Sequence, residues 1–402
     1  MSFRNRTGRL AIVVLCNCSQ ILWATGQHQP TPTEQANIAT NAARHFGDAP
    51  EDPGPLALHQ STSTRSEAVA RNMRKVADWQ LERAQPYFDR IWTWSALYTG
   101  FMAASDSLGD TKYRDAMLAM GQRFDWKLRS HLPNADDQSV GQTYLELYLQ
   151  KKDPAMMQPT QAELDAILSA PRDSTVPGKE IPWWWCDALF MAPPVWARMY
   201  AATGDRKYID YLDREWARTS DRLYDTREHL YARDSTYLTR TEVNGKKMFW
   251  SRGNGWVMAG IIRTLEYLPS DDPARATYIA QFKEMAARVA QIQSPDGLWR
   301  AGLLDPDSYD LPEISGSAFF TYALAAGVNE GLLDKKTYRP VIRKAWAGLV
   351  GHIYADGSLG CIQQTGAEPQ PFRPSASYTY GVGAFLLAGS EVMKMNHRPV
   401  AH

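Results

Sequence analysis

The chain has 402 residues, carries 44 acidic and 44 basic side chains, and has a formal net charge of +0. This length suffices for one large domain or for two ordinary ones. The balanced charge, without a basic run beyond the N-terminus, excludes the electrostatic footprint of a nucleic-acid-binding protein. The 14 tryptophans and 19 tyrosines suit either a carbohydrate-binding cleft or an aromatic-rich core.

Residues 1–24 have the pattern of a secretory signal peptide. Three arginines precede an apolar run at residues 10–16, and this order is typical of such signals. Polar residues at 17–20 interrupt the apolar run, which is therefore too short to span a bilayer stably, although a membrane anchor is the alternative. We expect an exported protein, periplasmic or secreted, without a membrane span once the signal is removed.

Residues 25–65 are rich in Gln, Thr, Pro and Ala, and this composition predicts a linker or a surface-wrapping arm before a catalytic domain at 66–402. Removal of the signal leaves Cys186 and Cys361, whose pairing the sequence does not decide. The chain contains no CxxC or HExxH motif and no cluster of histidines, so we expect no metal site.

From residue 66 the pattern is helical and repetitive. Alanine-rich segments with apolar residues three and four apart recur, each before a turn that leads into another helix. In each turn an Asp can cap the next helix while a Tyr faces the core. These pairs are Asp110 with Tyr113, Asp205 with Tyr208, Asp272 with Tyr278, and Asp334 with Tyr338. Because stacked helical hairpins of this length close into a toroid, we predict an all-α fold, an (α/α)6 barrel with loops gathered at one mouth.

Three consecutive tryptophans at 183–185 are followed, two residues later, by Asp187. Crowding by indole rings raises the pKa of a carboxyl, and a carboxyl protonated near neutral pH can act as a general acid. The alternative is an Asp that caps a helix beneath an aromatic cluster. Pro182 suits a first helical turn, so we expect Asp187 near the start of that helix, where the macrodipole opposes the effect of burial.

Adjacent acids, Asp136 and Asp137, begin another predicted helix, which also carries Gln142. Capping explains one Asp at a helix start. The second acid has no capping role, so we interpret Asp137 as a candidate second active-site carboxylate. The alternative is that this stretch only caps the helix.

Aromatic and glycine-rich stretches precede three further helices. Trp92 and Trp94 form either a stacking wall for a sugar ring or part of the core. At 249–256, Arg252 lies between two aromatic residues and presents a planar fork that matches the carboxylate of an acidic sugar. The alternative is a Gly-Asn-Gly turn that caps a helix from Trp256. The stretches 311–319 and 378–385 suit a polar cap and the tight packing of small residues, respectively.

Together these motifs resemble the unsaturated uronyl hydrolases of glycoside hydrolase family 105, which are related to family 88. The resemblance rests on Trp185-Cys-Asp187-Ala-Leu, Arg252-Gly-Asn-Gly-Trp256, Glu313-Ile-Ser-Gly-Ser and Tyr380-Gly-Val-Gly, in that order. It implies an (α/α)6 barrel without a metal or organic cofactor. It also implies hydrolysis of the Δ4,5-unsaturated uronic acid that lyases leave at the non-reducing end of oligosaccharides, derived from pectin, rhamnogalacturonan or ulvan.

By this resemblance Asp187 is the catalytic acid and Asp137 resembles the second carboxylate, while Arg252 and Trp256 hold the uronate. The other predicted substrate-binding residues are Trp92, Trp94, Gln142, Trp185, Arg233, Trp250, Asn254, Ser315 and Tyr380. The chain departs from the family at 231–235, where a usual His is missing and Arg233 lies nearby. The departure leaves open a galacturonyl or a glucuronyl donor and the identity of the next sugar.

Two further functions fit the same residues: another carbohydrate-active toroid enzyme, such as a lyase or a saturated-sugar hydrolase, and a non-catalytic sugar-binding protein. Loss of the double-bond absorbance of lyase-cut fragments distinguishes the first function from both. The sequence leaves a monomer or a homodimer open.

Overall fold

The computed structural model describes residues 53–131, 133–170 and 173–395. Contacts divide the chain into a unit from Met1 to Ala43 and a unit from Arg44 to His402, and the description that follows concerns the second unit. The predicted signal peptide at 1–24 lies outside the described residues. The first helix of the described part begins at Ser66, and the irregular residues before it contact 353–355, with Leu56 in an isolated bridge to Tyr354.

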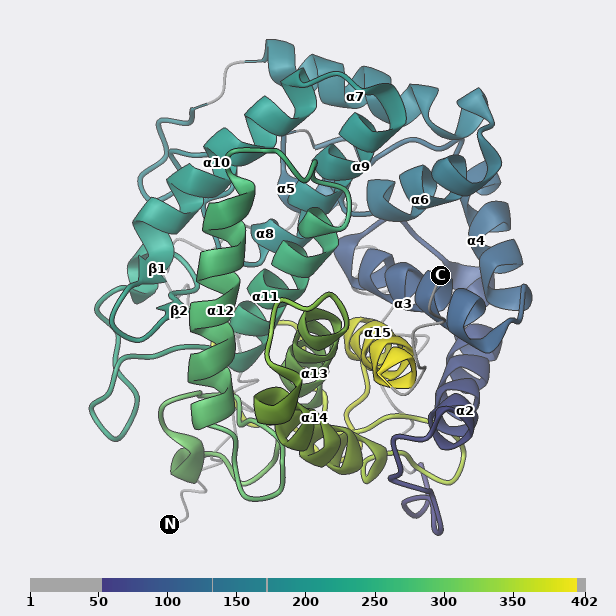
Figure 1. The fold of residues 1–402 in the computed structure, drawn as a ribbon, viewed down its shortest axis with the longest axis vertical. Helices are drawn as coiled ribbons and strands as arrows, with labels where there is room; N and C mark the ends of the chain where they lie inside the picture. Colours follow the sequence, from purple (N-terminus) through teal and green to yellow (C-terminus); the bar gives the residue numbers. More distant parts are fainter. Residues whose placement is uncertain (1–52, 132, 171–172, 396–402) are drawn as a thin grey trace, which may run out of the picture. The chain divides into compact units, whose positions relative to one another are not determined.

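Twelve long helices of the described residues alternate between an outer and an inner ring (Figure 1). The outer helices are α2 (Ser66–Ala84), α4 (Lys112–Arg123), α7 (Gln158–Ser169), α10 (Lys207–Leu223), α12 (Arg275–Gln291) and α14 (Lys335–Val350). The inner helices are α3 (Trp92–Leu108), α6 (Gly141–Lys151), α9 (Pro193–Thr203), α11 (Ser251–Leu265), α13 (Ile314–Asn329) and α15 (Thr379–Lys394). Each inner helix packs on the next, and α15 packs on α3, which closes the ring. The predicted (α/α)6 barrel is confirmed.

The repeated Asp and Tyr pairs belong to outer helices. Each Asp accepts a backbone N–H two or three residues later, at the start of its helix, but only Asp334 is the predicted N-cap itself; the other three lie one or two residues before the cap. Each Tyr is buried on the inward face of its helix. The four bonds are Lys112 N to Asp110 (3.2 Å), Lys207 N to Asp205 (3.1 Å), Ala274 N to Asp272 (2.9 Å) and Thr337 N to Asp334 (2.7 Å).

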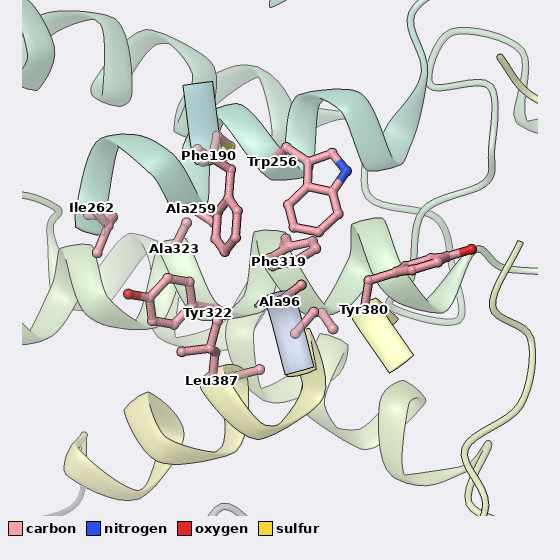
Figure 2. Packing of buried hydrophobic residues seen from close by; sticks show 14 of the residues in the cluster. Ala96, Phe190, Trp256, Ala259, Ile262, Phe319, Tyr322, Ala323, Tyr380 and Leu387 are labelled. Carbon is pink, nitrogen blue, oxygen red and sulfur yellow. The ribbon is translucent and has the colours of Figure 1, made fainter. Parts of the chain in front are cut away.

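Neighbouring inner helices cross closely where glycine removes a side chain. A Cβ atom on Gly383 of α15 would lie 2.1 Å from the carbonyl oxygen of Ala96 in α3, so only glycine fits there. Large aromatic rings fill the adjacent core: Trp256 lies 4.3 Å from Phe319 and 4.7 Å from Phe190 between ring centroids (Figure 2). The small-residue interpretation of the stretch at 378–385 is therefore confirmed.

Short elements connect the long helices, most of them between an outer helix and the inner helix that follows it. They are α5 (Ala135–Gln138), α8 (Ala188–Met191), four 3-10 turns, η1 (Gln85–Tyr87), η2 (Pro154–Met156), η3 (Ser235–Tyr237) and η4 (Pro306–Ser308), and two strands. The strands β1 (Tyr224–Asp225) and β2 (Leu230–Tyr231) pair antiparallel, with Tyr224 opposite Tyr231.

The helix expected from Pro182 begins only at Ala188, because Trp185 instead forms an extended bridge with Asp234. The chain restarts as α9 at Pro193, as the proline pair predicted.

Among the described residues, Cys186 and Cys361 are buried and free. No helix within the described residues is long and apolar enough to cross a membrane.

Candidate active site

The inner helices begin at the same end of the barrel, which we call the N-terminal mouth. Near their first turns α15 and α3 meet at Gly383 and Ala96, and α13 and α11 meet at Gly316 and Ser251. Helix N-termini carry partial positive charge, so their convergence favours an anionic ligand at this end. The predicted site residues lie in these first turns or in the loops before them.

Asp187 precedes α8, whose short first turn starts at Ala188. Its Oδ2 accepts a bond from the Cys186 thiol at 3.3 Å, and the side chain keeps part of its surface exposed. Burial raises the pKa of Asp187, while Arg233, the Cys186 bond and Arg252 lower it, and the net shift is upward. The carboxyl therefore holds its proton to higher pH than an ordinary Asp.

The two acids at the start of α5 have different surroundings. Asn134 caps this helix, since its Oδ1 accepts from the N–H of Asp136 at 2.9 Å. The Asp137 carboxylate is buried and accepts bonds from the backbone N–H of His131 (2.8 Å), the His131 ring (2.9 Å) and Arg129 (3.4 Å). Asp137, the acid selected from the sequence, therefore anchors the loop before α5.

Asp136 is the acid that interacts with Asp187. Burial raises the pKa of Asp136 to about 7, with further increases from the charges of Asp187 and Asp137 and decreases from Arg233 and Arg129. Within the described residues neither Asp136 nor Asp187 forms an ion pair. Because like charges close together do not both ionise easily, the charge of Asp187 helps Asp136 to retain its proton.

Arg233 is held beside this pair by the backbone. Its carbonyl accepts from Cys186 N at 2.8 Å, next to the bridge between Trp185 and Asp234. Its Nη1 donates to Asp234 at 2.6 Å, and its Nε is buried without a hydrogen bond to any described residue. With 20 % of its side chain exposed, Arg233 combines positive charge and spare donors at the mouth.

Arg252 is built into the wall of the mouth. Its Nη1 and Nη2 donate to the carbonyls of Gln363 and Gln364, both at 2.8 Å, and the guanidinium stacks on Trp250 and Tyr380. Only 1 % of its side chain is exposed. Its Nε has no hydrogen-bond partner among the described residues. The structure thus differs from the open anion fork expected from the sequence.

Four other predicted binding residues hold the loops of the same wall. Trp250 donates to the Gln363 side chain at 2.8 Å, and the Tyr380 hydroxyl donates to the Gln363 carbonyl. Asn254 bonds the backbone of Tyr231 in both directions, and Ser315 donates to Glu313 at 2.7 Å. All four are buried, so they shape the mouth from behind.

The predicted aromatic and amide residues divide between the mouth and the core. Trp92 is partly exposed and lies 5.3 Å from Tyr380 and 6.0 Å from Trp256 between ring centroids, with Trp256 itself buried. Trp94 packs on Phe88 in the core instead. Trp185 is buried behind the site, and so is Gln142, which bonds the Phe190 carbonyl and Arg263.

The sequence prediction missed two residues beside Arg233. Trp184 is partly exposed, and the guanidinium of Arg233 lies 5.3 Å from its ring. Lys179 lies 4.6 Å from the same ring. The run of three tryptophans was a signal for Trp184, but only the extended backbone at 184–186 shows which ring faces outward. Among the described residues, no three His, Cys, Asp or Glu side chains are grouped to hold a metal ion.

Comparisons with known proteins agree with this arrangement. Residues 57–396 match the family model described as Glycosyl Hydrolase Family 88. The chain is 40% identical over 358 residues to a protein of Formosa agariphila named unsaturated 3S-rhamnoglycuronyl hydrolase, and the alignment covers 85% of this chain and 94% of the relative.

Two solved structures superpose over most of the chain. One, named a polysaccharide lyase, has a TM-score of 0.77 at 31% identity and covers 84% of this chain and 99% of its own. The other, from Bacteroides vulgatus and named a glycosyl hydrolase of family 88, has a TM-score of 0.75 at 31% identity and covers 81% and 98%.

Proposed function

Because the chain belongs to glycosyl hydrolase family 88, we propose that this glycoside hydrolase removes a Δ4,5-unsaturated uronic acid from the non-reducing end of lyase-generated oligosaccharides. The observation that carries the proposal is the pair of Asp187 and Asp136, whose pKa values are raised, beside Arg233. The relative at 40% identity is named for an unsaturated rhamnoglycuronyl substrate, which supports the same class.

The substrate contains an enol ether, in which the C4–C5 double bond is conjugated with the ring oxygen. Asp187 donates its proton to C4, and the positive charge that develops at C5 is shared with the ring oxygen. Water then adds at C5 and returns a proton to the carboxyl pair. The resulting hemiketal opens, and the sugar at C1 leaves when the hemiacetal collapses, so no oxidant, reductant or cofactor is consumed.

The two carboxyls have different proposed roles. Asp187 is the proton donor, because it lies in the apolar wall and its closest protein donor is a weak thiol, 3.3 Å from Oδ2. Asp136 shares the protons of the pair and then orients the attacking water. Asp137 supports Asp136 from the loop side, and we do not assign it a chemical step.

Positive charge at the mouth suits a uronate. Arg233 and Arg252 both lower the pKa of Asp187, so both lie within electrostatic reach of the reacting atoms. Arg252 Nε and Trp256 Nε1 lie one turn apart on α11 and have no hydrogen-bond partner among the described residues. Buried donors without partners are costly, and a bound carboxylate would supply acceptors. Trp92 offers a partly exposed ring for the sugar face.

Ultraviolet absorbance of the double bond tests the proposal directly. A hydrolase of this kind removes the absorbance of lyase-cut pectin, rhamnogalacturonan or ulvan fragments and leaves saturated oligosaccharides intact. The alternative is a lyase, since one of the superposed structures is named a polysaccharide lyase. A lyase creates the double-bond absorbance from an intact polysaccharide. Because the two activities move the same signal in opposite directions, a rise on intact polymer contradicts the proposal.

Export is also part of the proposal, and it depends on residues 1–24, which lie outside the described residues. Fractionation of the producing cells, followed by N-terminal sequencing of the mature chain, tests it. Recovery of the full-length chain from the cytoplasm alone contradicts it.

A further inference from the structure

A single buried glutamine, Gln363, bonds to the starts of three inner helices at the N-terminal mouth. Its backbone N–H donates to the carboxylate of Glu313, which caps α13, at 3.1 Å. Its carbonyl accepts from Arg252 of α11 at 2.8 Å and from the Tyr380 hydroxyl of α15. The backbone of one loop residue therefore joins three helices that are distant in the sequence.

The side chain of Gln363 is fully buried, and both polar atoms of its amide are bonded. Oε1 accepts from Trp250 Nε1 at 2.8 Å, and Nε2 donates to the Glu368 carbonyl at 2.7 Å. One partner needs an acceptor and the other needs a donor, so a carboxylate or an apolar side chain of similar size leaves at least one of them unpaired. The amide thus attaches the loop 363–368 to the wall of the mouth.

The other end of this loop is attached to the segment that carries Arg233. The Glu368 carboxylate accepts from the Tyr237 hydroxyl at 2.9 Å. Tyr237 is the last residue of η3, whose N-cap side chain pairs with Arg233 at 2.6 Å. The loop 363–368 is therefore held at both ends, by the start of α11 and by η3.

This fixed loop determines which donor of Arg252 is left for a ligand. Nη1 and Nη2 of Arg252 donate to the carbonyls of Gln363 and Gln364, and Nε has no hydrogen-bond partner among the described residues. A guanidinium held at both terminal nitrogens keeps one orientation, so its Nε donor also keeps one direction. Binding to a group that is already ordered costs less conformational entropy, and this pre-organisation increases affinity.

We propose that Gln363 is a positioning residue that sets the direction of Arg252 Nε and thereby the affinity for the uronate carboxylate; this inference rests on the proposed function. Gln363 itself has no polar atom left for the substrate, because protein groups occupy each of them. Its effect passes through Arg252 and not through the proton donor Asp187. Substitution should therefore raise KM much more than it lowers kcat.

Gln363→Met tests the proposal, because it keeps the approximate volume of the side chain and removes both amide bonds. We expect KM for unsaturated uronyl fragments to rise about ten- to a hundredfold, with kcat within about threefold of wild type. Gln281→Met is the matched control, since Gln281 is also buried and accepts from the Trp216 indole at 3.2 Å, but between outer helices. It should change KM less than about twofold.

A double-mutant cycle shows whether the effect passes through Arg252. In the Arg252→Met background, Gln363→Met should raise KM less than about twofold, because the group that it positions is already absent. An equal rise in both backgrounds, or no rise in the single variant, overturns the inference. If Gln363→Met does not fold, Gln363→Asn takes its place, since it keeps the amide but is too short to reach both partners.

Calorimetric binding of unsaturated oligosaccharides to the Asp187→Asn variant separates this inference from the proposed function. If the wild-type enzyme removes no double-bond absorbance, the proposed function fails. Binding that is about tenfold weaker after Gln363→Met is added to Asp187→Asn would still support the positioning role. Equal affinities of the two proteins would reject it.

Discussion

At the end of the barrel opposite the N-terminal mouth, a cavity of about 690 Å³ is lined by the last turns of α3, α11, α13 and α15. Both ends contain buried carboxyls. Burial raises the pKa of Glu146 at this far end, where Arg263 and Arg198 oppose the shift. Those two arginines contact the Glu146 carboxylate directly, at 3.3 and 3.6 Å.

The N-terminal mouth lacks such direct pairing. Asp187 and Asp136 feel the charge of Arg233 but, within the described residues, form no ion pair with it. The comparison shows that a buried acid and a large cavity do not by themselves identify a site. What distinguishes the N-terminal mouth is a pair of carboxyls with raised pKa values and, among the described residues, no ion pair. Beside them lie Arg233 and Arg252, each with an Nε donor that no described residue accepts.

Removal of the proton donor should have the largest effect. Asp187→Asn is expected to lower kcat about a thousandfold, since general-acid groups contribute about 10²- to 10⁴-fold. Loss of double-bond absorbance measures the rate, and circular dichroism checks the fold. If Asp187→Asn keeps more than a tenth of the wild-type kcat, another residue is the proton donor.

Substitution of the two adjacent acids of α5 should give the next largest effects, and the two variants should differ in kind. Asp136→Asn is expected to lower kcat about a hundredfold with little loss of thermal stability, because its carboxylate makes no ion pair among the described residues. Asp137→Asn should instead cost about 1–3 kcal/mol of stability through its bonds to His131 and Arg129. The reverse pattern would restore Asp137 as the second active-site carboxylate.

Substitution of the buried acid at the far end of the barrel should change stability rather than activity. Glu146→Gln leaves Arg198 and Arg263 buried with less counter-charge, so we expect a loss of about 3 kcal/mol in the free energy of unfolding. Its kcat should stay within about threefold of wild type. A large fall in kcat in well-folded Glu146→Gln protein would place chemistry at this end as well.

Stability should also depend on pH through Asp136. Its folded pKa of about 7 lies above the ordinary value of 3.8, so the folded state binds the proton more tightly than the unfolded chain. The free energy of unfolding should therefore fall as the pH rises from about 4 to 7. Asp136→Asn should flatten this dependence and raise Tm above pH 7, whereas an unchanged slope would argue against the raised pKa.

The smallest effect concerns the pH profile of the reaction. Because the donor must be protonated, kcat should fall as the pH rises through the raised pKa of Asp187. In Asp136→Asn this alkaline limb should lie at lower pH, since removal of a neighbouring acid lowers the pKa of Asp187. A limb at unchanged pH would show that the two carboxyls are not coupled.

The barrel was predictable because its signals are periodic. The Asp residues at the starts of the outer helices and the buried tyrosines within these helices recur in the sequence, and glycines such as Gly383 mark the crossings of the inner ring. The sequence also singled out Asp187, through its motif, and Arg233, through a departure from the family pattern, and the structure places both at the mouth. These features depend on local chemistry that the sequence records directly.

The choice between adjacent residues was not predictable. Asp136 and Asp137 point in directions about 100° apart on a helical turn. The helix is capped by Asn134, one residue before it begins, so the capping argument does not distinguish the two acids. Likewise, which tryptophan of 183–185 faces outward depends on the bridge between Trp185 and Asp234. The sequence also did not show that both terminal nitrogens of Arg252 donate to carbonyls of 363–364, because those residues lie more than a hundred positions later.

The packing of α15 on α3 determines the stage of synthesis at which the barrel can close. Thr379 bonds the carbonyl of Thr93 at 2.8 Å across 286 residues of sequence, and Tyr380 packs on Trp92 beside it. Such distant contacts form late in folding, since the intervening chain must first be synthesised. A ribosome-bound chain that stops short of α15 would therefore carry Asp136 and Asp187 in an open, unclosed arc. Chemical competence should emerge only after α15 has been synthesised.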